Sequence, residues 1–269
     1  MAERNVAIVT GASGGIGRQT SLALARKGYC LALAARREDL LAEVARSCEA
    51  AGSPSARSFV ADVSRREQVE LLVNSAAELF GRVDVMVNNA GHGVHARVHE
   101  TTDGQMRAVF DVNFFGVFYG CRAVAPVMMA QRSGHIFNVS SVIGKRGAPF
   151  NGAYCASKFA VCGLTDSLRV EMMPYGVLVT CVCPGLTDTE FFDHVDGGSA
   201  RSKSGFKAVR TLQPPSRVAR AIVRAIGRKT PELVFTPGGK FLVLLAAFWP
   251  AMADRMMKLY HDDLVKNTG

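Results

Sequence analysis

A chain of 269 residues, 48% of them hydrophobic, is long and apolar enough to form one large domain with a full core. The formal net charge of +9 favours an anionic partner. No run of Lys and Arg with interleaved aromatic residues occurs, so a phosphorylated cofactor or an acidic surface is favoured and nucleic acid is not expected. The seven cysteines are odd in number and scattered singly, which argues against a disulfide framework and indicates reduced thiols in a cytoplasmic protein.

Apolar runs typical of buried strands alternate with helical patterns along the chain. The expected strands are Val6–Thr10, Tyr29–Ala35, Ser58–Ala61, Val83–Asn88, His135–Ser140, Val177–Cys183 and Glu232–Thr236. The expected helices lie at about 15–28, 38–52, 66–80, 105–132, 153–174 and 216–227. This alternation predicts an α/β fold in which about seven strands form a doubly wound parallel sheet with helices on both faces.

No repeat, low-complexity tract or linker divides the chain, so residues 1–269 are expected to form a single domain. Its core would run from about 5 to 236. Residues 188–214 are rich in Gly, Ser, Lys and Arg and are expected to form a lid, and 237–269 would be a C-terminal extension. Because the first strand pattern starts at Val6, no signal or transit peptide is expected.

A glycine-rich turn follows the first expected strand and leads into the first expected helix. It reads Gly11-Ala12-Ser13-Gly14-Gly15-Ile16-Gly17. Glycines at this place let the backbone approach a pyrophosphate, whose charge the helix N-terminus stabilises. The turn therefore predicts a dinucleotide cofactor, although its G-x-x-x-G-x-G spacing differs from the common G-x-G-x-x-G pattern.

The end of the second expected strand indicates which dinucleotide is preferred. A ribose 2′-hydroxyl requires an acidic residue there, whereas this chain has Ala35 followed by Arg36 and Arg37. Two guanidinium groups fit a 2′-phosphate, to which Ser13 can add a hydroxyl. NADP(H) is therefore expected in preference to NAD(H).

Tyr154 and Lys158 are one helical turn apart, and Ser141 precedes the tyrosine by thirteen residues. Side chains at i and i+4 share one helix face, so the ammonium can lie beside the phenol. A nearby cation favours phenolate and is expected to lower the tyrosine pKa toward neutral pH. The serine hydroxyl would hold a substrate carbonyl oxygen within reach of that tyrosine.

Together these motifs resemble the short-chain dehydrogenase/reductase family over about residues 5–236, which implies a Rossmann-type fold. Thr10–Gly17 matches the T-G-x-x-x-G-x-G turn of this family, and Ser141, Tyr154 and Lys158 match its catalytic residues. The resemblance implies that Asn113 kinks its helix and joins a water relay. The further cofactor contacts that it implies are Asp62 and Val63 at the adenine, Asn89, Ala90 and Gly91 near the adenine ribose, and Pro184, Gly185, Thr187 and Thr189 at the nicotinamide.

One departure from the family pattern is Thr187, which replaces a usual Ile or Val. Since members of the family use mainly the backbone at this position, cofactor binding should survive the change. The expected activity is the interconversion of a carbonyl and a secondary alcohol, with Tyr154 as general acid/base. Two alternatives stay open: a catalytically silent NADP(H)-sensing binding protein, and an epimerase or dehydratase that uses the same Tyr and Lys.

Residues that flank the catalytic set are mostly apolar, which favours a lipophilic substrate such as a steroid-, acyl- or lipid-like ketone. The candidate substrate contacts beside Ser141 and Tyr154 are His92, Ile143, Phe150 and Phe191. No metal is expected. The histidines at 92, 95 and 99 lack a recognised ligand pattern, and Cys181 and Cys183 lack a second ligand pair.

The chain ends in an apolar segment at 241–252 that is interrupted by Pro250 and is too short to span a bilayer as one helix. It is expected to pack on its own subunit or a partner, or to make peripheral membrane contact. The resemblance implies a homodimer, and in many relatives a tetramer. The helices at about 105–132 and 153–174 would form the dimer through apolar residues that include Phe114, Phe118, Phe159 and Leu168.

Overall fold

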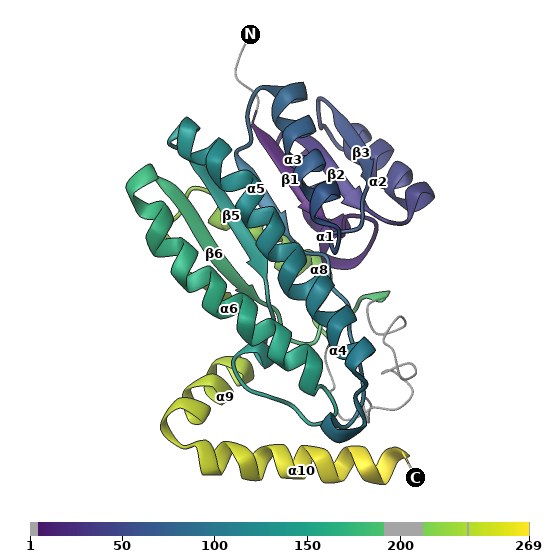
Figure 1. Cartoon of the computed structure of the whole chain (residues 1–269), viewed down its shortest axis with the longest axis vertical. Helices are drawn as coiled ribbons and strands as arrows, with labels where there is room; N and C mark the ends of the chain where they lie inside the picture. Colours follow the sequence, from purple (N-terminus) through teal and green to yellow (C-terminus); the bar gives the residue numbers. More distant parts are fainter. Residues whose placement is uncertain (1–4, 191–211, 236, 269) are drawn as a thin grey trace.

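The computed structural model describes residues 5–190, 212–235 and 237–268, and its centre is a seven-stranded parallel sheet (Figure 1). The strand order β3-β2-β1-β4-β5-β6-β7 reverses direction next to β1, as in a doubly wound fold. The strands are β1 (Val6–Thr10), β2 (Cys30–Ala35), β3 (Ala56–Val60), β4 (Val85–Asn88), β5 (Gly134–Val139), β6 (Val177–Cys183) and β7 (Glu232–Val234). The predicted α/β fold is confirmed, with strand limits shifted by at most two residues.

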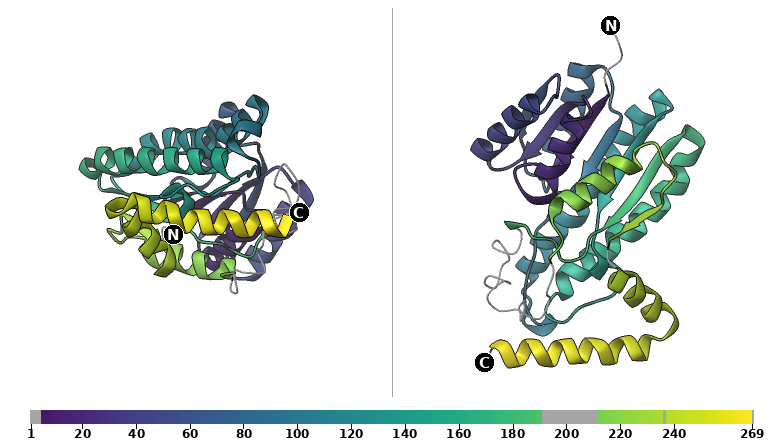
Figure 2. Two further views of the ribbon diagram at one scale, coloured as in Figure 1. Left: turned by 90° about the horizontal axis from the view of Figure 1, so that it is seen from below. Right: turned by 180° about the vertical axis from the view of Figure 1, so that it is seen from behind.

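Two layers of helices cover the sheet, because successive strand residues point to opposite faces. On one face, Ala7 and Val9 belong to a buried cluster with α1 (Gly15–Ala25), α2 (Glu38–Ala50) and α8 (Pro215–Ala225). On the other face, Ile8 belongs to a cluster with α3 (Arg66–Phe80), α5 (Gly116–Gln131) and α6 (Gly152–Met172). Figures 1 and 2 show these layers from the front and from behind.

The long helix predicted at 105–132 contains a local change of pitch. It begins as α4 (Asp103–Phe110), where Thr102 and Gln105 form a capping box, passes through the π-helical turn η2 (Asp111–Phe115), and continues as α5. Within the described residues, 103–131 is one helix long and apolar enough to span a membrane. Its residues Val117, Val124 and Met128 are buried against the sheet, as in a core helix.

The C-terminal extension forms two helices, α9 (Pro237–Phe248) and α10 (Pro250–Thr268), separated at Pro250 as predicted. Figures 1 and 2 show α10 lying beyond the carboxyl ends of the strands. An ion pair between Arg146 and Asp254 ties it to the loop before α6. The apolar side chains Phe241, Leu244, Phe248 and Trp249 are exposed. These four side chains do not pack on the same subunit, and contact of the segment with a partner or a membrane stays a prediction.

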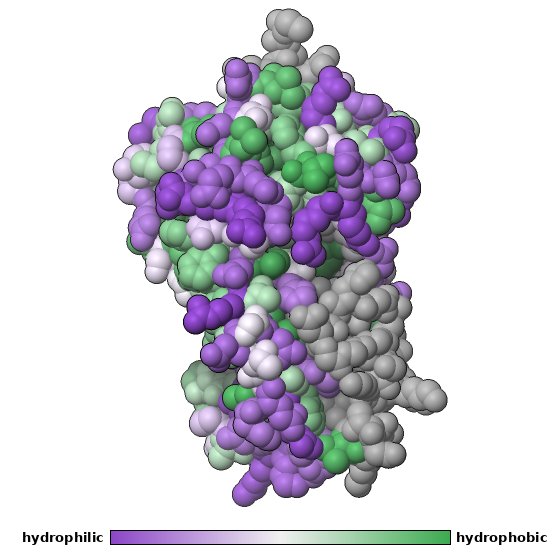
Figure 3. Space-filling model, turned by 45° about the vertical axis from the view of Figure 1, so that its right-hand side comes forward, coloured by the Kyte–Doolittle hydropathy of each residue, from purple (hydrophilic) through white to green (hydrophobic). Residues whose placement is uncertain are grey.

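The face turned forward in Figure 3 carries hydrophobic side chains scattered among hydrophilic ones over its upper part. The predicted lid at 188–214 falls mainly on 191–211, which lie outside the described residues, as does Phe191.

Candidate active site

A cavity of about 650 Å³ lies at the carboxyl ends of the central strands, where the strand order reverses. This is where open parallel sheets bind their ligands. Most of the residues predicted to bind the cofactor line this cavity: Gly11, Ser13, Gly14, Gly15, Ile16, Arg36, Arg37, Asp62, Val63, Asn89, Ala90, Gly91, Pro184, Gly185, Thr187 and Thr189. The catalytic candidates Ser141, Tyr154 and Lys158 line the same cavity.

The glycine-rich turn is closely packed against the end of β4. Gly11 has a φ of 64°, and a Cβ there would lie 2.9 Å from the Cα of Ala90. A Cβ on Gly17 would lie 2.2 Å from the carbonyl oxygen of Gly11, so Gly17 is a packing position beneath the cavity wall. Thr10 Oγ1 accepts hydrogen bonds from the backbone N–H groups of Asn89 (3.0 Å) and Ala90 (3.2 Å). These contacts fix the turn so that its backbone faces the cavity.

Helix α1 starts at Gly15 with Gly14 as its N-cap, and no side chain caps it. The first N–H groups of the helix are therefore available to a negatively charged ligand, and the cradle has the shape and polarity that a pyrophosphate requires.

Arg37 and Ser13 lie together at the end of β2, as the 2′-phosphate hypothesis expects. Arg37 donates from Nε (3.3 Å) and Nη2 (3.2 Å) to Ser13 Oγ. Its Nη1 also donates to Glu190 Oε2 at 2.9 Å. Glu190 was not predicted to lie at this site, because it is 153 residues further along the chain than Arg37.

Asp62, the predicted adenine contact, lies just after β3 and lines the cavity. Its Oδ1 accepts hydrogen bonds from the backbone N–H (3.0 Å) and the hydroxyl (2.8 Å) of Ser64. Burial raises the pKa of Asp62, but the bonds from Ser64 and the charges of Arg36 and Arg65 outweigh it and hold that pKa below the ordinary value. Asp62 is therefore an ionised acceptor at neutral pH.

The three catalytic candidates come from two adjacent elements. Ser141 follows β5 and caps the short 3-10 helix η3 (Val142–Gly144), while Tyr154 and Lys158 lie on one face of α6. Lys158 is 2% exposed, and its Nζ donates to the carbonyl oxygen of Val139 at 2.9 Å. The same Nζ lies 5.6 Å from the centroid of the Tyr154 ring. The predicted convergence of a hydroxyl, a phenol and an ammonium is thus present.

The expected direction of the Tyr154 pKa is not found. Burial raises the pKa of Tyr154 above its usual value, and the hydrogen bond with Ser141 only partly opposes this. Burial also lowers the pKa of Lys158 to about 8. The expected lowering fails because both groups are largely removed from water, and desolvation disfavours the charged form of each.

Asn113 lies in the π-helical turn η2, fully buried behind the cavity. Its Oδ1 accepts from the backbone N–H of His92 (2.7 Å), and its Nδ2 donates to the His92 carbonyl (2.9 Å) and to Ser157 Oγ (3.0 Å). Ser157 Oγ donates in turn to the carbonyl of Tyr154 at 2.8 Å. The side chain of Asn113 therefore joins the loop after β4 to the catalytic helix; its expected part in a water relay stays a prediction.

The remaining wall of the cavity is mainly apolar and includes Val94, Val112, Ile143 and Leu186; the predicted substrate contact His92 also lines the cavity. Phe150 is not among the lining residues. It has a φ of 62°, and its ring stacks on His95 at 5.5 Å and on His261 at 5.3 Å.

The stacked Phe150 holds α10 over the cavity, which Tyr260 of that helix lines. Tyr260 was not predicted to line the cavity, because nothing local to 250–268 in the sequence indicates that this helix returns to it.

Comparison with known proteins agrees with this geometry. A family model described as short chain dehydrogenase matches residues 5–198. A short-chain dehydrogenase/reductase from Burkholderia phymatum, solved in complex with NAD, has a TM-score of 0.84 and 30% identity, covering 92% of this chain and 95% of that one. An alcohol dehydrogenase from Thermococcus sibiricus, solved with 5-hydroxy-NADP, has a TM-score of 0.77 and 30% identity, covering 87% and 96%. A 3-ketodihydrosphingosine reductase from Bacteroides thetaiotaomicron is 31% identical over 266 residues, which is 94% of this chain and 95% of the relative.

Proposed function

The chain belongs to the short-chain dehydrogenase family of oxidoreductases, and from this premise we propose that it interconverts a lipophilic ketone and the corresponding secondary alcohol with NADP(H). The observation that carries the reaction class is the convergence of Ser141, Tyr154 and Lys158 in one cavity with the glycine-rich cradle. The cofactor supplies the hydride when it is bound, and the protein supplies orientation and a proton.

The residues divide the work as follows. Ser141 holds the substrate oxygen by a hydrogen bond, and Tyr154 delivers a proton from its hydroxyl to that oxygen during reduction. Lys158, fixed on the carbonyl of Val139, stabilises the phenolate that forms and reaches the ribose hydroxyls of a bound nucleotide. Alcohol oxidation uses the same groups in reverse, with Tyr154 accepting the proton.

The preference for NADP(H) rests on charge at the end of β2. Ala35 offers no carboxylate for a ribose 2′-hydroxyl, while Arg36, Arg37 and Ser13 surround the corner of the cavity where a 2′-phosphate would lie. One relative was solved with an NADP derivative and another with NAD, so the choice depends on these side chains and not on the fold.

A lipophilic substrate is supported by the apolar wall that includes Val94, Val112, Ile143 and Leu186. Helix α10 extends the site with Tyr260 and carries further apolar residues beside it. One relative is named a 3-ketodihydrosphingosine reductase, and a substrate of that kind agrees with such a wall. We therefore place long-chain and polycyclic ketones first among the substrates.

The decisive experiment follows NADPH oxidation with a panel of long-chain, steroid, quinone and sugar carbonyls. Tyr154→Phe should lower kcat by about 100- to 10,000-fold while NADPH binding stays near wild type, because the phenol acts in proton transfer. Tyr175→Phe, in the 3-10 turn η4 (Met173–Tyr175) after α6, is the matched control. Equal kcat in Tyr154→Phe and wild type would refute the mechanism.

A sensing protein would consume no NADPH with any carbonyl, and an epimerase or dehydratase would form product without net NADPH oxidation.

A further inference from the structure

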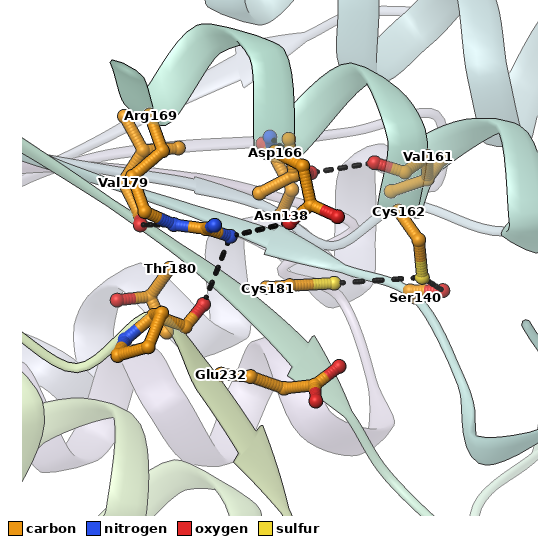
Figure 4. Close-up of polar contacts among 12 residues, drawn as sticks. Asn138, Ser140, Val161, Cys162, Asp166, Arg169, Val179, Thr180, Cys181 and Glu232 are labelled. Atoms are coloured by element: carbon orange, nitrogen blue, oxygen red, sulfur yellow. Dashed lines mark hydrogen bonds and ion pairs between the residues drawn. The ribbon is translucent and has the colours of Figure 1, made fainter. Parts of the chain in front are cut away.

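Three buried cysteines converge between α6 and β6, outside the cavity. Cys162 comes from α6, and Cys181 and Cys183 point from β6 toward that helix, because alternate strand residues share a face. Their sulfur atoms all lie within 4.8 Å of one another, with 3.7 Å between Cys162 and Cys181 and 3.7 Å between Cys181 and Cys183. Figure 4 shows the Cys162 and Cys181 side chains directed at each other across the helix–strand interface.

These separations match the ligand spacing of a thiolate-bound metal ion. Zn–S bonds of about 2.3 Å in tetrahedral geometry place the sulfurs about 3.8 Å apart. A cation can therefore be held by the three sulfurs with little movement of α6 or β6.

A carboxylate that could act as a fourth ligand lies beside the three sulfur atoms. Glu232 of the edge strand β7 has its Oε1 3.3 Å from Cys183 Sγ, and Figure 4 shows its carboxylate beneath Cys181. The Glu232 side chain is 31% exposed, which gives an ion a route from solvent to the buried sulfurs. A carboxylate oxygen completes a tetrahedral set of four and leaves no open position, which is typical of structural sites.

The surroundings orient these groups. Lys145 Nζ lies 2.8 Å from Glu232 Oε1, and Ser140 Oγ lies 3.3 Å from Cys162 Sγ. Such outer groups commonly fix metal ligands and tune their affinity.

We propose that Cys162, Cys181, Cys183 and Glu232 form a structural binding site for a zinc-like divalent cation. Binding replaces the thiol protons, which pass to solvent, and the Lys145 ammonium offsets part of the negative charge of the ligands. Thiolate sulfur selects zinc-like ions over Mg²⁺ and Ca²⁺, which prefer oxygen.

A bound ion would fasten the catalytic helix to two strands. Cys162 is one turn beyond Lys158 on α6, and Ser140 Oγ donates to the Lys158 carbonyl at 2.8 Å while contacting Cys162. Loading should therefore raise the thermal stability of the domain without supplying any reacting group. The sequence did not predict this site, because Cys162 precedes Cys181 by nineteen residues and lies on another element.

The test is Co²⁺ titration of the full, tag-free chain in a reductant that does not bind metals. Wild type should take up one equivalent, with the near-ultraviolet thiolate-to-cobalt band and the intense visible bands of a tetrahedral site, and Zn²⁺ should displace it. Cys162→Ser, Cys181→Ser and Cys183→Ser should each lose the charge-transfer band or weaken binding at least tenfold. Cys48→Ser is the matched control, because Cys48 is buried in α2 on the opposite face of the sheet.

Serine in the core can destabilise the fold, so Glu232→Gln on the edge strand gives a second measurement. It should bind Co²⁺ about 10- to 100-fold more weakly while its metal-free Tm stays near wild type. Zn²⁺ should raise the Tm of wild type and of Cys48→Ser more than that of Glu232→Gln.

The proposal is overturned if wild type shows no thiolate-to-cobalt band, or if Cys181→Ser keeps both the band and the wild-type affinity for Co²⁺. It is also overturned if thiol titration of the denatured, unreduced protein finds five free thiols in place of seven, since the cluster would then form a disulfide. These outcomes do not depend on the proposed dehydrogenase activity.

Discussion

The guanidinium of Arg37 is shared between Ser13 and Glu190, and its ion pair with the Glu190 carboxylate measures 2.9 Å. Both partners of this pair are substantially exposed, at 42% and 58% of their side chains. The carboxylate thus occupies part of the donor set that a cofactor 2′-phosphate would use.

Replacing Glu190 by Gln should therefore tighten NADPH binding. An exposed ion pair contributes about 0–1 kcal/mol, so the Kd for NADPH should fall up to about fivefold. The Kd for NADH should change little, because NADH lacks the 2′-phosphate. Both constants can be measured by the fluorescence of the bound reduced nicotinamide. Glu70→Gln, which disrupts the Arg66 pair on α3, is the control. Weaker NADPH binding in Glu190→Gln would mean that the carboxylate supports the cofactor site.

Removing the guanidinium should have the opposite effect. Arg37→Ala is expected to raise the KM for NADPH about 10- to 100-fold, since a hydrogen bond to a charged group contributes about 1.5–3 kcal/mol. Arg36→Ala combined with Arg37→Ala should raise it further, with a much smaller change for NADH. Arg46→Ala removes a charge from the exposed side of the same helix α2 and should leave both constants unchanged. If the double variant still prefers NADPH, the phosphate assignment is wrong.

The sequence predicted those parts of the molecule that depend on local patterns. The strands are continuous apolar runs, and the motifs around Gly11, Asn89 and Tyr154 lie where parallel strands end, so the topology brings them to one edge of the sheet. Phe150, a predicted substrate contact, is not among the residues that line the cavity; its ring stacks on His95, which does line it, and on His261 of α10. Glu190 and Tyr260 reach the site from distant segments, and nothing in the sequence around either residue predicts that its side chain lines the cavity.

Long-range packing also explains why the sequence predicted the wrong direction for the pKa of Tyr154. Spacing along a helix gives the proximity of Lys158, but the size of desolvation depends on how the whole cavity packs around both groups. Long-range packing of this kind cannot be deduced from residue spacing.

Buried His135 on β5 should make the stability of the fold depend on pH. Burial lowers its pKa from 6.5 to about 4. Its Nε2 lies 2.8 Å from Thr180 Oγ1, which donates to the Thr230 carbonyl, and its Nδ1 accepts from the Gly227 N–H. All of these contacts suit the neutral ring, because a proton on Nδ1 would face another donor.

Between pH 6.5 and 4 the unfolded chain binds a proton at His135 that the folded chain does not, so this group makes stability rise with pH. Its contribution is complete above pH 6.5 and is lost as the pH falls toward 4. Urea unfolding should therefore show about 2 kcal/mol less stability at pH 5 than at pH 7 from this residue. His135→Gln should reduce the pH dependence by that amount, whereas His99→Gln, at an exposed position, should not. Equal pH dependence in wild type and His135→Gln would contradict this account.

Exposed apolar side chains on one helix layer predict how the chain assembles. On the helix layer formed by η2, α5 and α6, Phe115, Phe159 and Val170 are exposed at 38%, 45% and 63%, whereas the predicted contacts Phe114 and Leu168 pack partly into the core. Apolar side chains of this size on two neighbouring helices are expected to be covered by the same helices of a second copy, in an isologous dimer. Phe115→Glu combined with Val170→Glu should convert the dimer to a monomer, measured by sedimentation velocity. Leu71→Glu changes an equally exposed residue on α3 and should leave the dimer intact. A wild-type chain that sediments as a monomer would refute the dimer, and a Leu71→Glu monomer would place the interface on α3.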